Sequence, residues 1–329
     1  MKKFLLTICA AVLRLKDHKM KRSKVLMILS LIILSLITPA QAQDLGVELS
    51  EVSAKKFNVA IEKFYATLPQ AKGTYKSRQR PIVIEGAMNT ETEVLIRALK
   101  NPVVYREMNY MFVAGTYKDY PVVVVRTEIG MANAAASTAL AIKKFNPCAV
   151  INQGTAGGHD PALKIGDIII GEFSFDSTAF RSAYSAAGAG IDLTKQENIG
   201  TYAYDDTSDK FKAYTEYRAS RPLLNTAFKV ADEHEEFNAV AGVIGTSNGW
   251  LECVDYINFL HDKYGSSCEE METNVAAQVC QNAGVPFIGI RVLSDNVTNS
   301  REYVPESAKT CQEFVLLVVD NYVRDFLKK

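Results

Sequence analysis

Residues 269–295 read EEMETNVAAQVCQNAGVPFIGIRVLSD. The first part predicts a helix, because apolar residues recur there at the spacing of one helix face: Met271, Val275, Ala276, Val279, Cys280 and Ala283. Gly284 and Pro286 follow, as glycine and proline commonly do after a helix C-terminus. The nearly continuous apolar run 287–294 then predicts a buried strand. A helix, a turn and a buried strand in succession are typical of an α/β fold.

Three charged residues of this stretch are candidates for a functional site. Arg291 interrupts the predicted strand and Asp295 ends it, so strand alternation predicts that both side chains lie on one face. Glu272 lies at the predicted helix start, where the macrodipole favours a carboxylate. Ligands of open α/β sheets bind at the carboxyl ends of strands, where these groups are expected to converge. Each acid also has a structural explanation: Glu272 as a partner of the helix dipole, and Asp295 as a turn former. A buried arginine is different, because its charge needs a partner.

Strand and helix patterns alternate through the rest of the chain, which predicts one α/β domain over residues 81–329. A polar lead-in, residues 43–80, precedes it and contains one amphipathic helical piece at about 50–65. The predicted strands are 81–84, 121–125, 149–152, 168–170 and 239–245, and the predicted helices are 132–144, 223–234, 313–326 and one that begins at Thr90.

The turn after the first predicted strand carries two glutamates with different expected roles. Thr90 and Glu93 match the capping box S/T-x-x-E, which gives Glu93 a structural role. Glu91 has no such role in the pattern and lies beside the strand's carboxyl end. We therefore consider Glu91 a candidate acid or base.

Two further features leave alternatives open. The glycine-rich segment 154–158 follows a predicted strand and suits either a plain tight turn or a loop whose N–H groups approach a ligand. Its spacing is neither GxGxxG nor a P-loop, so a dinucleotide or ATP is not implied. Trp250, the only tryptophan, is either a core residue or a stacking surface for a flat ring.

The N-terminus carries the pattern of an export signal. From Met20, a basic start is followed by the apolar run 25–38 and by Ala40-Gln41-Ala42, an A-x-A cleavage site. We expect a leader over residues 1–42, cleavage after Ala42, a periplasmic or extracellular location, and a translation start at Met1 or Met20. The alternative is a membrane anchor, but the run is shorter than the ~20 residues needed to span a bilayer.

Charge and cysteine content exclude several classes of function. The chain has 37 basic and 37 acidic residues, and the leader contains eight of the basic ones and a single acid. The mature chain therefore has 29 basic and 36 acidic residues, a net charge of about −7, which excludes a basic nucleic-acid surface. Its five cysteines form no CxxC pair, so no metal site, disulfide framework or cofactor is predicted. Cys253 with Cys268 is the one pairing considered, and we expect it not to form.

The chain resembles the nucleoside phosphorylase and nucleosidase superfamily, and most closely the 5'-methylthioadenosine/S-adenosylhomocysteine nucleosidases. The resemblance covers about 82–328 and is carried by four blocks in the family's order. These are Gly86-Ala87-Met88-Asn89-Thr90-Glu91, Asn152-Gln153-Gly154-Thr155-Ala156-Gly157-Gly158 with Gly166-Asp167-Ile168, Glu270-Met271-Glu272, and Arg291-Val292-Leu293-Ser294-Asp295.

The resemblance implies a three-layer α/β/α domain with a central mixed, partly barrel-like sheet, usually forming a homodimer. It also implies hydrolysis of the N-glycosidic bond of a purine nucleoside. Asp295 would protonate purine N7, and Glu91 would activate water with help from Arg291 and Thr155. Glu272 would bind the ribose hydroxyls.

Further substrate-binding positions follow from the same resemblance. Met271 would pack under the sugar, Ile129 would line the pocket of the 5'-substituent, and the Trp250 region would face the purine. Ser294 belongs to the same substrate-binding set. Its neighbour in sequence, Asp295, is the acid.

Some positions depart from the family pattern. Asn89 and Thr90 replace acidic residues usually found there, which leaves Glu91 or Glu93 as the catalytic carboxylate. His159 stands where these nucleosidases have an apolar residue. The polar segment 173–217 fits the family poorly, and we expect a lid or a subunit contact there.

Two other functions stay open. A phosphorylase of the same fold would use phosphate in place of water, but its usual phosphate loop is replaced by Glu85-Gly86-Ala87-Met88. A secreted nucleoside-binding or storage protein would have no need for all four groups Glu91, Glu272, Arg291 and Asp295.

Overall fold

The predicted strands form one mixed sheet, part of which closes into a barrel. The computed structural model describes residues 58–205 and 207–328. The predicted leader, its cleavage site after Ala42 and the beginning of the lead-in lie outside these residues. Within them, no helix is long and apolar enough to cross a membrane.

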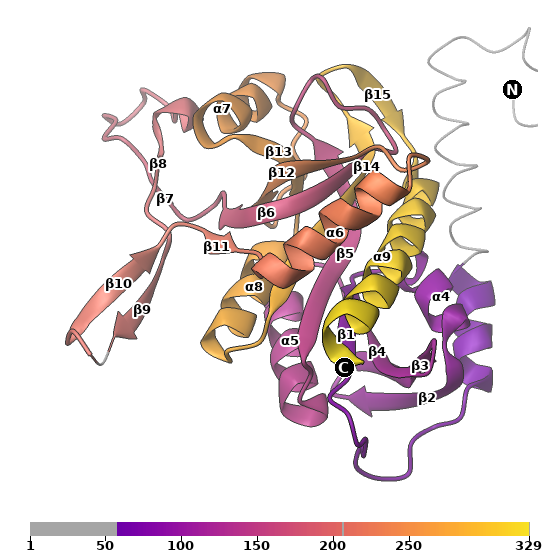
Figure 1. Cartoon of the computed structure of the whole chain (residues 1–329). Coiled ribbons are helices and arrows are strands. Elements are labelled where there is room, and N and C mark those ends of the chain that lie inside the picture. The colour runs from indigo at the N-terminus through magenta and orange to yellow at the C-terminus, as the bar shows by residue number, and fades with distance from the viewer. Residues whose placement is uncertain (1–57, 206, 329) are drawn as a thin grey trace, which may run out of the picture. The chain divides into compact units, whose positions relative to one another are not determined.

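Five strands make up the closed barrel (Figure 1). They are β5 (Ala149–Gly158), β14 (Phe287–Asn296), β6 (Ile168–Asp176), β12 (Ala239–Thr246) and β13 (Ser266–Glu270). The ring closes because β14 pairs with both β5 and β6, while β13 pairs with both β12 and β5. The β14–β6 and β13–β5 pairs are antiparallel and the other three are parallel. The predicted α/β class with a mixed, partly barrel-like sheet is confirmed.

The sheet continues beyond the barrel from the first half of β5. The added strands are β1 (Ile82–Gly86), β4 (Tyr120–Arg126), β3 (Tyr110–Tyr117) and β2 (Lys100–Glu107), in that order. The short strands β15 (Ser300–Tyr303) and β11 (Tyr217–Arg218) pair with β14 and β6. The β2–β3 hairpin was not predicted, because β2 is a polar edge strand that contains Pro102 and has little apolar alternation.

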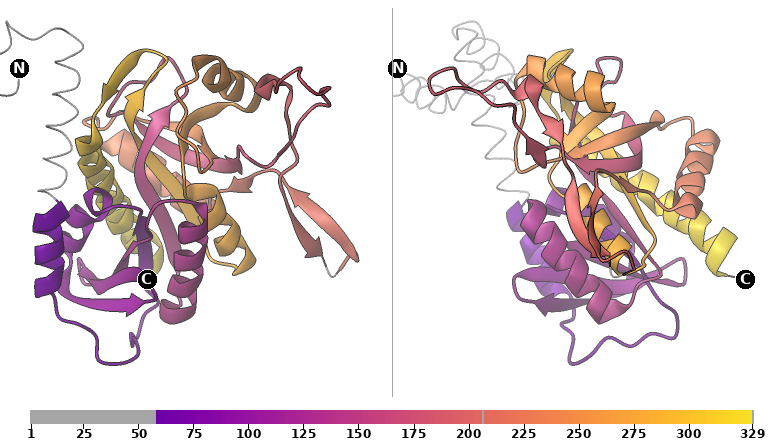
Figure 2. Two further views of the ribbon diagram at one scale, coloured as in Figure 1. Left: turned by 180° about the vertical axis from the view of Figure 1, so that it is seen from behind. Right: turned by 90° about the vertical axis from the view of Figure 1, so that its left-hand side faces the viewer.

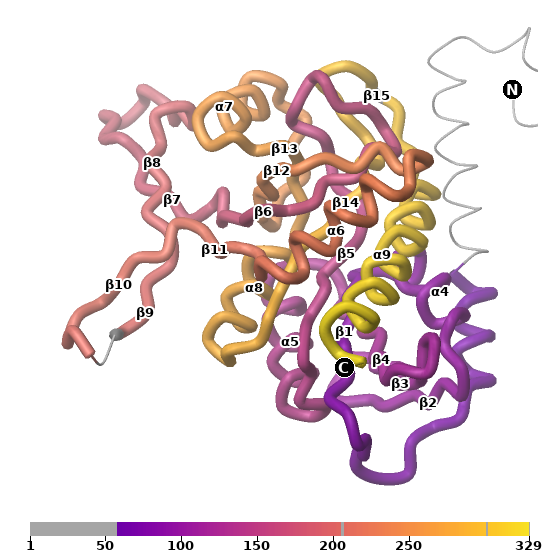
Figure 3. Tube along the Cα trace, in the orientation of Figure 1, coloured from indigo at the N-terminus to yellow at the C-terminus, as the bar shows by residue number. Residues whose placement is uncertain are grey.

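Helices cover the sheet in two groups (Figures 1 and 3). In one group α9 packs against both α4 and α6, and in the other α5 packs against α8. A further helix, α7, packs against β13. The bounds are α4 (Asn89–Ala98), α5 (Met131–Phe145), α6 (Arg221–Glu233), α7 (Val254–Tyr264), α8 (Thr273–Asn282) and α9 (Ala308–Tyr322), which continues as a π-helical turn over Val323–Leu327.

Residues 177–205 and 207–216 form an arm that extends away from the barrel (Figures 1 and 2). It contains two small two-stranded sheets and a 3-10 turn. These are β7 (Phe180–Arg181) with β8 (Glu197–Asn198), β9 (Thr201–Asp205) with β10 (Lys210–Tyr214), and Leu193–Lys195. The polar segment predicted from residue 173 begins four residues later, because β6 continues to Asp176.

Part of the predicted lead-in packs on the sheet domain. Residues 58–67 are helical, and the buried hydroxyl of Tyr65 lies 3.3 Å from Thr92 Oγ1. Arg126 Nη1 lies 2.5 Å from Glu62 Oε1. Residues of the lead-in therefore contact both α4 and β4. The domain boundary at residue 81 stays a prediction.

The stretch 269–295 differs in two ways from the prediction. Glu269 and Glu270 belong to the buried strand β13, and α8 begins only at Thr273, with Glu272 as its N-cap. The strand β14 continues past Asp295, and its register against β5 shifts between Leu293 and Asp295. A β-bulge inserts an extra residue and breaks the alternation. The inference that Arg291 and Asp295 share a face by alternation was therefore wrong.

Candidate active site

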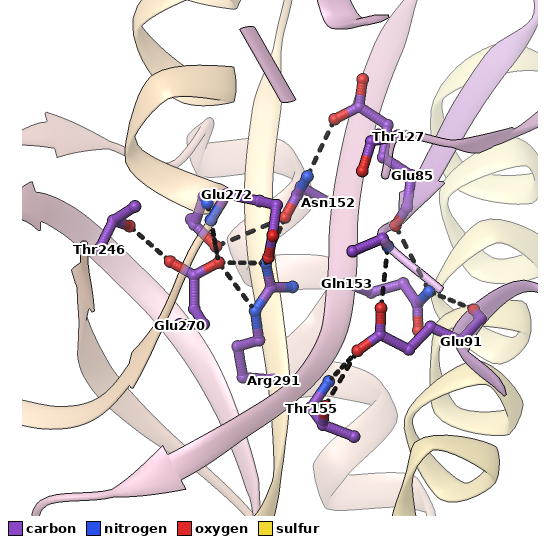
Figure 4. A network of polar contacts seen from close by, with 12 residues as sticks. Glu85, Glu91, Thr127, Asn152, Gln153, Thr155, Thr246, Glu270, Glu272 and Arg291 are labelled. Atoms are coloured by element: carbon purple, nitrogen blue, oxygen red, sulfur yellow. Dashed lines mark hydrogen bonds and ion pairs between the residues drawn. The ribbon is translucent and has the colours of Figure 1, made fainter. Parts of the chain in front are cut away.

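A carboxylate fills the turn between β1 and α4. Glu91 Oε2 accepts hydrogen bonds from the backbone N–H groups of Ala87 (2.8 Å) and Met88 (3.1 Å). Its Oε1 accepts from the N–H (2.8 Å) and hydroxyl (3.0 Å) of Thr155, on the glycine-rich end of β5. A Cβ on Gly154 would lie 2.6 Å from Glu91 Oε1, so the carboxylate approaches β5 because this position is glycine. Figure 4 shows Glu91 beside Thr155.

The prediction that Glu93 caps this helix was wrong. The N-cap of α4 is Met88, so the third helical residue is Glu91, and it is Glu91 that bonds back to the Met88 N–H. Glu93 instead lies 2.5 Å from Arg97 at the surface, one helical turn further on. Glu91 therefore has the structural role that the pattern S/T-x-x-E assigned to Glu93.

Arg291 is paired with Glu270, a residue of β13. Its Nη2 lies 2.5 Å and its Nε 3.2 Å from Glu270 Oε2. Arg291 was expected to assist Glu91, but its direct ion-pair partner is Glu270. The same carboxylate accepts the N–H groups of Glu272 (2.9 Å) and Thr273 (2.8 Å), and Thr246 donates to its other oxygen (2.5 Å). Glu270 thus binds the buried arginine and the start of α8 together.

Asn152 links this pair to a second buried carboxylate. Arg291 Nη2 donates to Asn152 Oδ1, and Asn152 Nδ2 donates to Glu85 Oε2 at 3.0 Å (Figure 4). Thr138 donates to the other oxygen of Glu85 at 2.8 Å. Burial raises the pKa of Glu85 to about 7. Arg291 and Asn152 of the barrel and Glu85 of the neighbouring strand β1 thus form one continuous hydrogen-bonded chain.

Glu272 lies beside this chain at the N-cap of α8. Its Oε1 accepts the N–H of Gly130 at 2.8 Å, and its Oε2 lies 4.0 Å from Arg291. Burial, followed by the like charge of Glu270, raises its pKa to about 8. Through its bond to Gly130, Glu272 joins α8 to the loop that carries Ile129. Its other oxygen, Oε2, approaches Arg291 no closer than 4.0 Å.

Asp295 is buried at the bulge of β14. Its Oδ1 accepts the hydroxyl of Ser294 at 2.8 Å. Burial raises the pKa of its carboxyl. A Cβ on Gly157 would lie 3.3 Å from Asp295 Oδ2, so the carboxyl lies over this glycine of β5.

The strand β5 connects the two ends of the candidate site. Thr155 contacts Glu91, and Gly157 lies under Asp295. Residues two apart on a strand are separated by about 7 Å. An acid and a carboxylate on this spacing can approach opposite ends of one small ligand. Glu91, Thr155 and Asp295 are thus brought together as predicted, and their catalytic roles stay predictions.

The remaining predicted positions surround this centre. Met271 is half-buried between Glu270 and Glu272, and Ile129 is exposed on the loop before α5. Trp250 is 64% exposed, with its ring centroid 5.5 Å from that of Tyr303. The core alternative for Trp250 is therefore wrong. His159 is buried just after β5.

Sequence reasoning missed Glu270, Asn152 and Glu85. An arginine in a buried strand indicated that a buried acidic partner exists. Glu270, in the block Glu270-Met271-Glu272, could have been considered as that partner. Glu85 carries the same signal, because it is the one charged residue of the buried strand β1. Residues 58–205 and 207–328 contain no group of His, Cys, Asp or Glu side chains arranged to hold a metal ion. The five cysteines of this part are free thiols.

Comparison with known proteins identifies curated relatives that are named as nucleosidases. A 5'-methylthioadenosine/S-adenosylhomocysteine nucleosidase of Bacillus pumilus (strain SAFR-032) is 33% identical over 215 residues, which cover 65% of this chain and 85% of the relative. A nucleosidase of the same name from Shewanella sp. (strain W3-18-1) is 34% identical over 223 residues, covering 66% of this chain and 87% of the relative.

Solved structures show the same fold. The 5'-methylthioadenosine/S-adenosylhomocysteine nucleosidase of Neisseria meningitidis, in complex with methylthio-immucillin-A, has a TM-score of 0.61 at 22% identity and covers 73% of this chain and 99% of its own. Futalosine hydrolase of Helicobacter pylori has a TM-score of 0.60 at 23% identity, covering 73% and 97%. The model of the phosphorylase superfamily matches residues 81–324. The chain belongs to the phosphorylase superfamily.

Proposed function

We propose that this protein hydrolyses the N-glycosidic bond of purine nucleosides, of the 5'-methylthioadenosine/S-adenosylhomocysteine type, and releases adenine and a ribose derivative. The observation that carries the proposal is the buried carboxylate of Glu91 in the turn after β1. Its neighbours Asp295 and Glu272 supply an acid and a further carboxylate around the same stretch of β5. The names of the curated relatives support the choice of substrate.

The chemistry needs a proton donor at the base. An N-glycosidic bond breaks through an oxocarbenium-like state, so electrons move into the purine as it leaves. Protonation of N7 by Asp295 makes the purine a better leaving group, and general acid catalysis of this kind contributes about 10²–10⁴-fold. Burial raises the pKa of Asp295, which favours the protonated form that the step requires. Ser294 donates to Oδ1, which leaves Oδ2 for the proton.

Water is the better nucleophile for this site than phosphate. A phosphate would need the N–H groups of the turn after β1, but those of Ala87 and Met88 already donate to Glu91. A carboxylate has about four acceptor positions, and Glu91 uses all four. The Thr155 hydroxyl is the one of these four donors that can rotate away. Its rotation frees a lone pair on Oε1 to take a proton from an attacking water.

Glu272 suits the ribose. A carboxylate accepts hydrogen bonds from a pair of vicinal hydroxyls, and Glu272 holds one oxygen on Gly130 while the other faces Arg291 at 4.0 Å. Since burial raises the pKa of Glu272 to about 8, the group would stabilise positive charge on the sugar only in its ionised form, which is favoured above that pH. Met271 would pack under the ring, and Ile129 and Trp250 would lie around the 5'-group and the purine.

A substrate panel tests the proposal. Purified protein is incubated with 5'-methylthioadenosine, S-adenosylhomocysteine, adenosine and inosine, and free base is measured by chromatography. Release of adenine from the 5'-thio nucleosides, faster than from adenosine, is the expected result. Tight binding of all four without any base release would support a binding or storage protein instead. Preference for inosine over the three adenine nucleosides would contradict the proposed substrate class.

We also propose that the protein is exported and dimeric. The segment 20–42 supports cleavage after Ala42 and a location in the periplasm or outside the cell. N-terminal sequencing of the exported protein is expected to begin at Gln43, and an intact Met20 would contradict this. Sedimentation of the mature chain is expected to give the mass of a homodimer.

A further inference from the structure

Two buried polar atoms face each other behind the predicted acid. His159 is 1% exposed, and its Nε2 lies 3.7 Å from Glu269 Oε2. Among the described residues, neither atom has a hydrogen-bond partner. Unpartnered buried polar atoms are costly, so a favourable interaction between this histidine and this carboxylate is needed to offset that cost.

The proton count of the histidine follows from its other nitrogen. His159 Nδ1 lies 3.0 Å from Ser266 Oγ, and Ser266 donates its only hydroxyl proton to the carbonyl of Cys268 at 3.1 Å. In this arrangement Nδ1 carries a proton and donates it to Ser266. In the other tautomer, Ser266 donates to a bare Nδ1 and the Nε2–H of a neutral imidazole faces Glu269. With Nδ1 protonated, a neutral imidazole would leave Nε2 a bare acceptor opposite an acceptor oxygen of Glu269. A proton on Nε2 removes this conflict and makes the two side chains an imidazolium–carboxylate pair.

The register of three neighbouring strands places this pair next to Asp295. Gly157 on β5 is paired with Glu269 on β13 and with Asp295 on β14. A Cβ on Gly157 would lie 3.3 Å from Asp295 Oδ2 and 3.5 Å from Glu269 Cγ. Since Gly157 has no side chain, the two acids flank it in one row across the sheet.

Glu269 is held in this row from a second side. Its Oε1 accepts the N–H of Leu251 at 2.7 Å, in the loop that carries Trp250. Other groups also face Asp295: Glu252 from that loop and Tyr303 from β15, the residue paired with it. The charge of Glu252 acts on Asp295 in the same direction as that of Glu269, since both raise its pKa.

We propose that Glu269 and His159 are positioning residues for the general acid: as an ion pair beside Asp295, they set with opposite signs how firmly Asp295 holds the proton it donates. This inference rests on the proposed function. A carboxylate next to an acid favours the protonated acid, and a cation favours the ionised one. Beyond the effect of burial, the charges of Glu269 and Glu252 raise the pKa of Asp295 and that of His159 lowers it.

Substitution of each partner separates the proposal from a purely structural role. Glu269→Gln keeps an acceptor for Leu251 and removes the negative charge. His159→Asn keeps a donor for Ser266 and removes the positive charge. The reaction needs protonated Asp295, so kcat/KM falls at high pH as Asp295 ionises. This fall is the basic limb of the plot of kcat/KM against pH. Glu269→Gln is expected to move this limb to lower pH and His159→Asn to higher pH, each by on the order of one unit.

Two further samples sharpen the test. The double variant is expected to return the limb toward its wild-type position, and His234→Asn, a change at a surface histidine paired with Glu236, is the matched control with no shift. Imidazole ¹⁵N spectra are expected to show both nitrogens of His159 protonated in the wild type at neutral pH. Loss of the Nε2 proton is expected in Glu269→Gln. Thermal unfolding identifies any variant that does not fold.

Shifts of both single variants in the same direction, or no shift in either folded variant, would overturn the inference. A wild-type spectrum in which either nitrogen of His159 is bare would do the same. The failure of the proposed function looks different: Asp295→Asn would then retain full turnover. If Asp295→Asn loses turnover while Glu269→Gln and His159→Asn leave the basic limb unshifted, the proposed nucleosidase function is supported and only the role of the pair is contradicted.

Discussion

Arg291 is bound to Glu270 by a buried ion pair, with Nη2 2.5 Å from Oε2. The same carboxylate accepts two N–H groups at the start of α8. The pair therefore fixes where β14 and α8 meet, and with them the position of Glu272. The arginine acts on the candidate site through this fixed geometry and through its charge, rather than by a direct bond to Glu91.

Removal of one partner of this pair is expected to be costly. Arg291→Met should lower the free energy of unfolding by about 3–5 kcal/mol, because it leaves a buried carboxylate without its cation. Adding Glu270→Gln should recover part of the loss, since the amide oxygen still accepts from α8. Denaturant unfolding of the two single variants and the double variant measures the coupling. The same cycle with Glu91→Gln is the control, and a coupling there as large as that with Glu270 would contradict the assigned pairing.

Asp295→Asn is expected to remove base release and leave the fold intact. An amide cannot deliver a proton to the purine, and its shape is nearly that of the acid, so turnover should fall by about 10²–10⁴-fold. Asp119→Asn is the matched control, because Asp119 lies on an exposed turn with φ of 64°, which asparagine tolerates. Adenine release is measured for both variants. Wild-type turnover in folded Asp295→Asn would mean that the residue only accepts the Ser294 hydroxyl.

Glu91 and Glu93 are expected to respond differently to the same change. Glu91→Gln should lower turnover by on the order of 10² or more, because an amide cannot accept the proton of water. It should also cost about 1–3 kcal/mol of stability, because the amide places a donor against backbone N–H groups. Glu93→Gln, which removes only a surface ion pair with Arg97, should leave both nearly unchanged. Equal activity losses in the two variants would contradict the assignment.

The buried carboxyl of Glu85 should make stability depend on pH. Its pKa is raised from 4.5 to about 7 in the folded chain. The unfolded state therefore loses this proton first, and raising the pH from about 4.5 to about 7 favours unfolding. The free energy of unfolding of the wild type minus that of Glu85→Gln is expected to fall across this window and to level off on either side. A difference that rises with pH would show that Glu85 is ionised at low pH. Glu107→Gln, at an exposed residue paired with Lys144, is the control without such a fall.

Local patterns predicted much of the fold and part of the site. The strands β1, β5, β12 and β14 follow from apolar runs between turn residues. Closure of the barrel did not follow, because it depends on β13, a strand whose sequence Ser266–Glu270 is polar and was interpreted in part as a helix start. Its polar side chains are buried against residues distant in sequence: Glu270 pairs with Arg291, and Glu269 accepts the N–H of Leu251. Contacts between distant residues leave no periodic pattern in the sequence.

The candidate site was predicted by residue type more reliably than by geometry. Glu91, Glu272, Arg291 and Asp295 do lie around one end of β5. The bulge at Ser294 and the partner of Arg291 were not predicted, since register shifts and long-range pairings depend on neighbouring strands. The capping pattern at Thr90 was wrong for a local reason. The carboxylate of Glu91 accepts the N–H of Met88, so the N-cap of α4 is Met88, two residues before Thr90.

Product analysis with and without phosphate tests the central claim most directly. Wild-type protein is incubated with 5'-methylthioadenosine in a phosphate-free buffer and in the same buffer with added phosphate, and both base and sugar products are identified. Hydrolysis assisted by Glu91 predicts equal rates and a free 5'-substituted ribose in both buffers. A faster reaction with phosphate and a ribose 1-phosphate product would contradict the account, because phosphate would then occupy the turn that Glu91 fills.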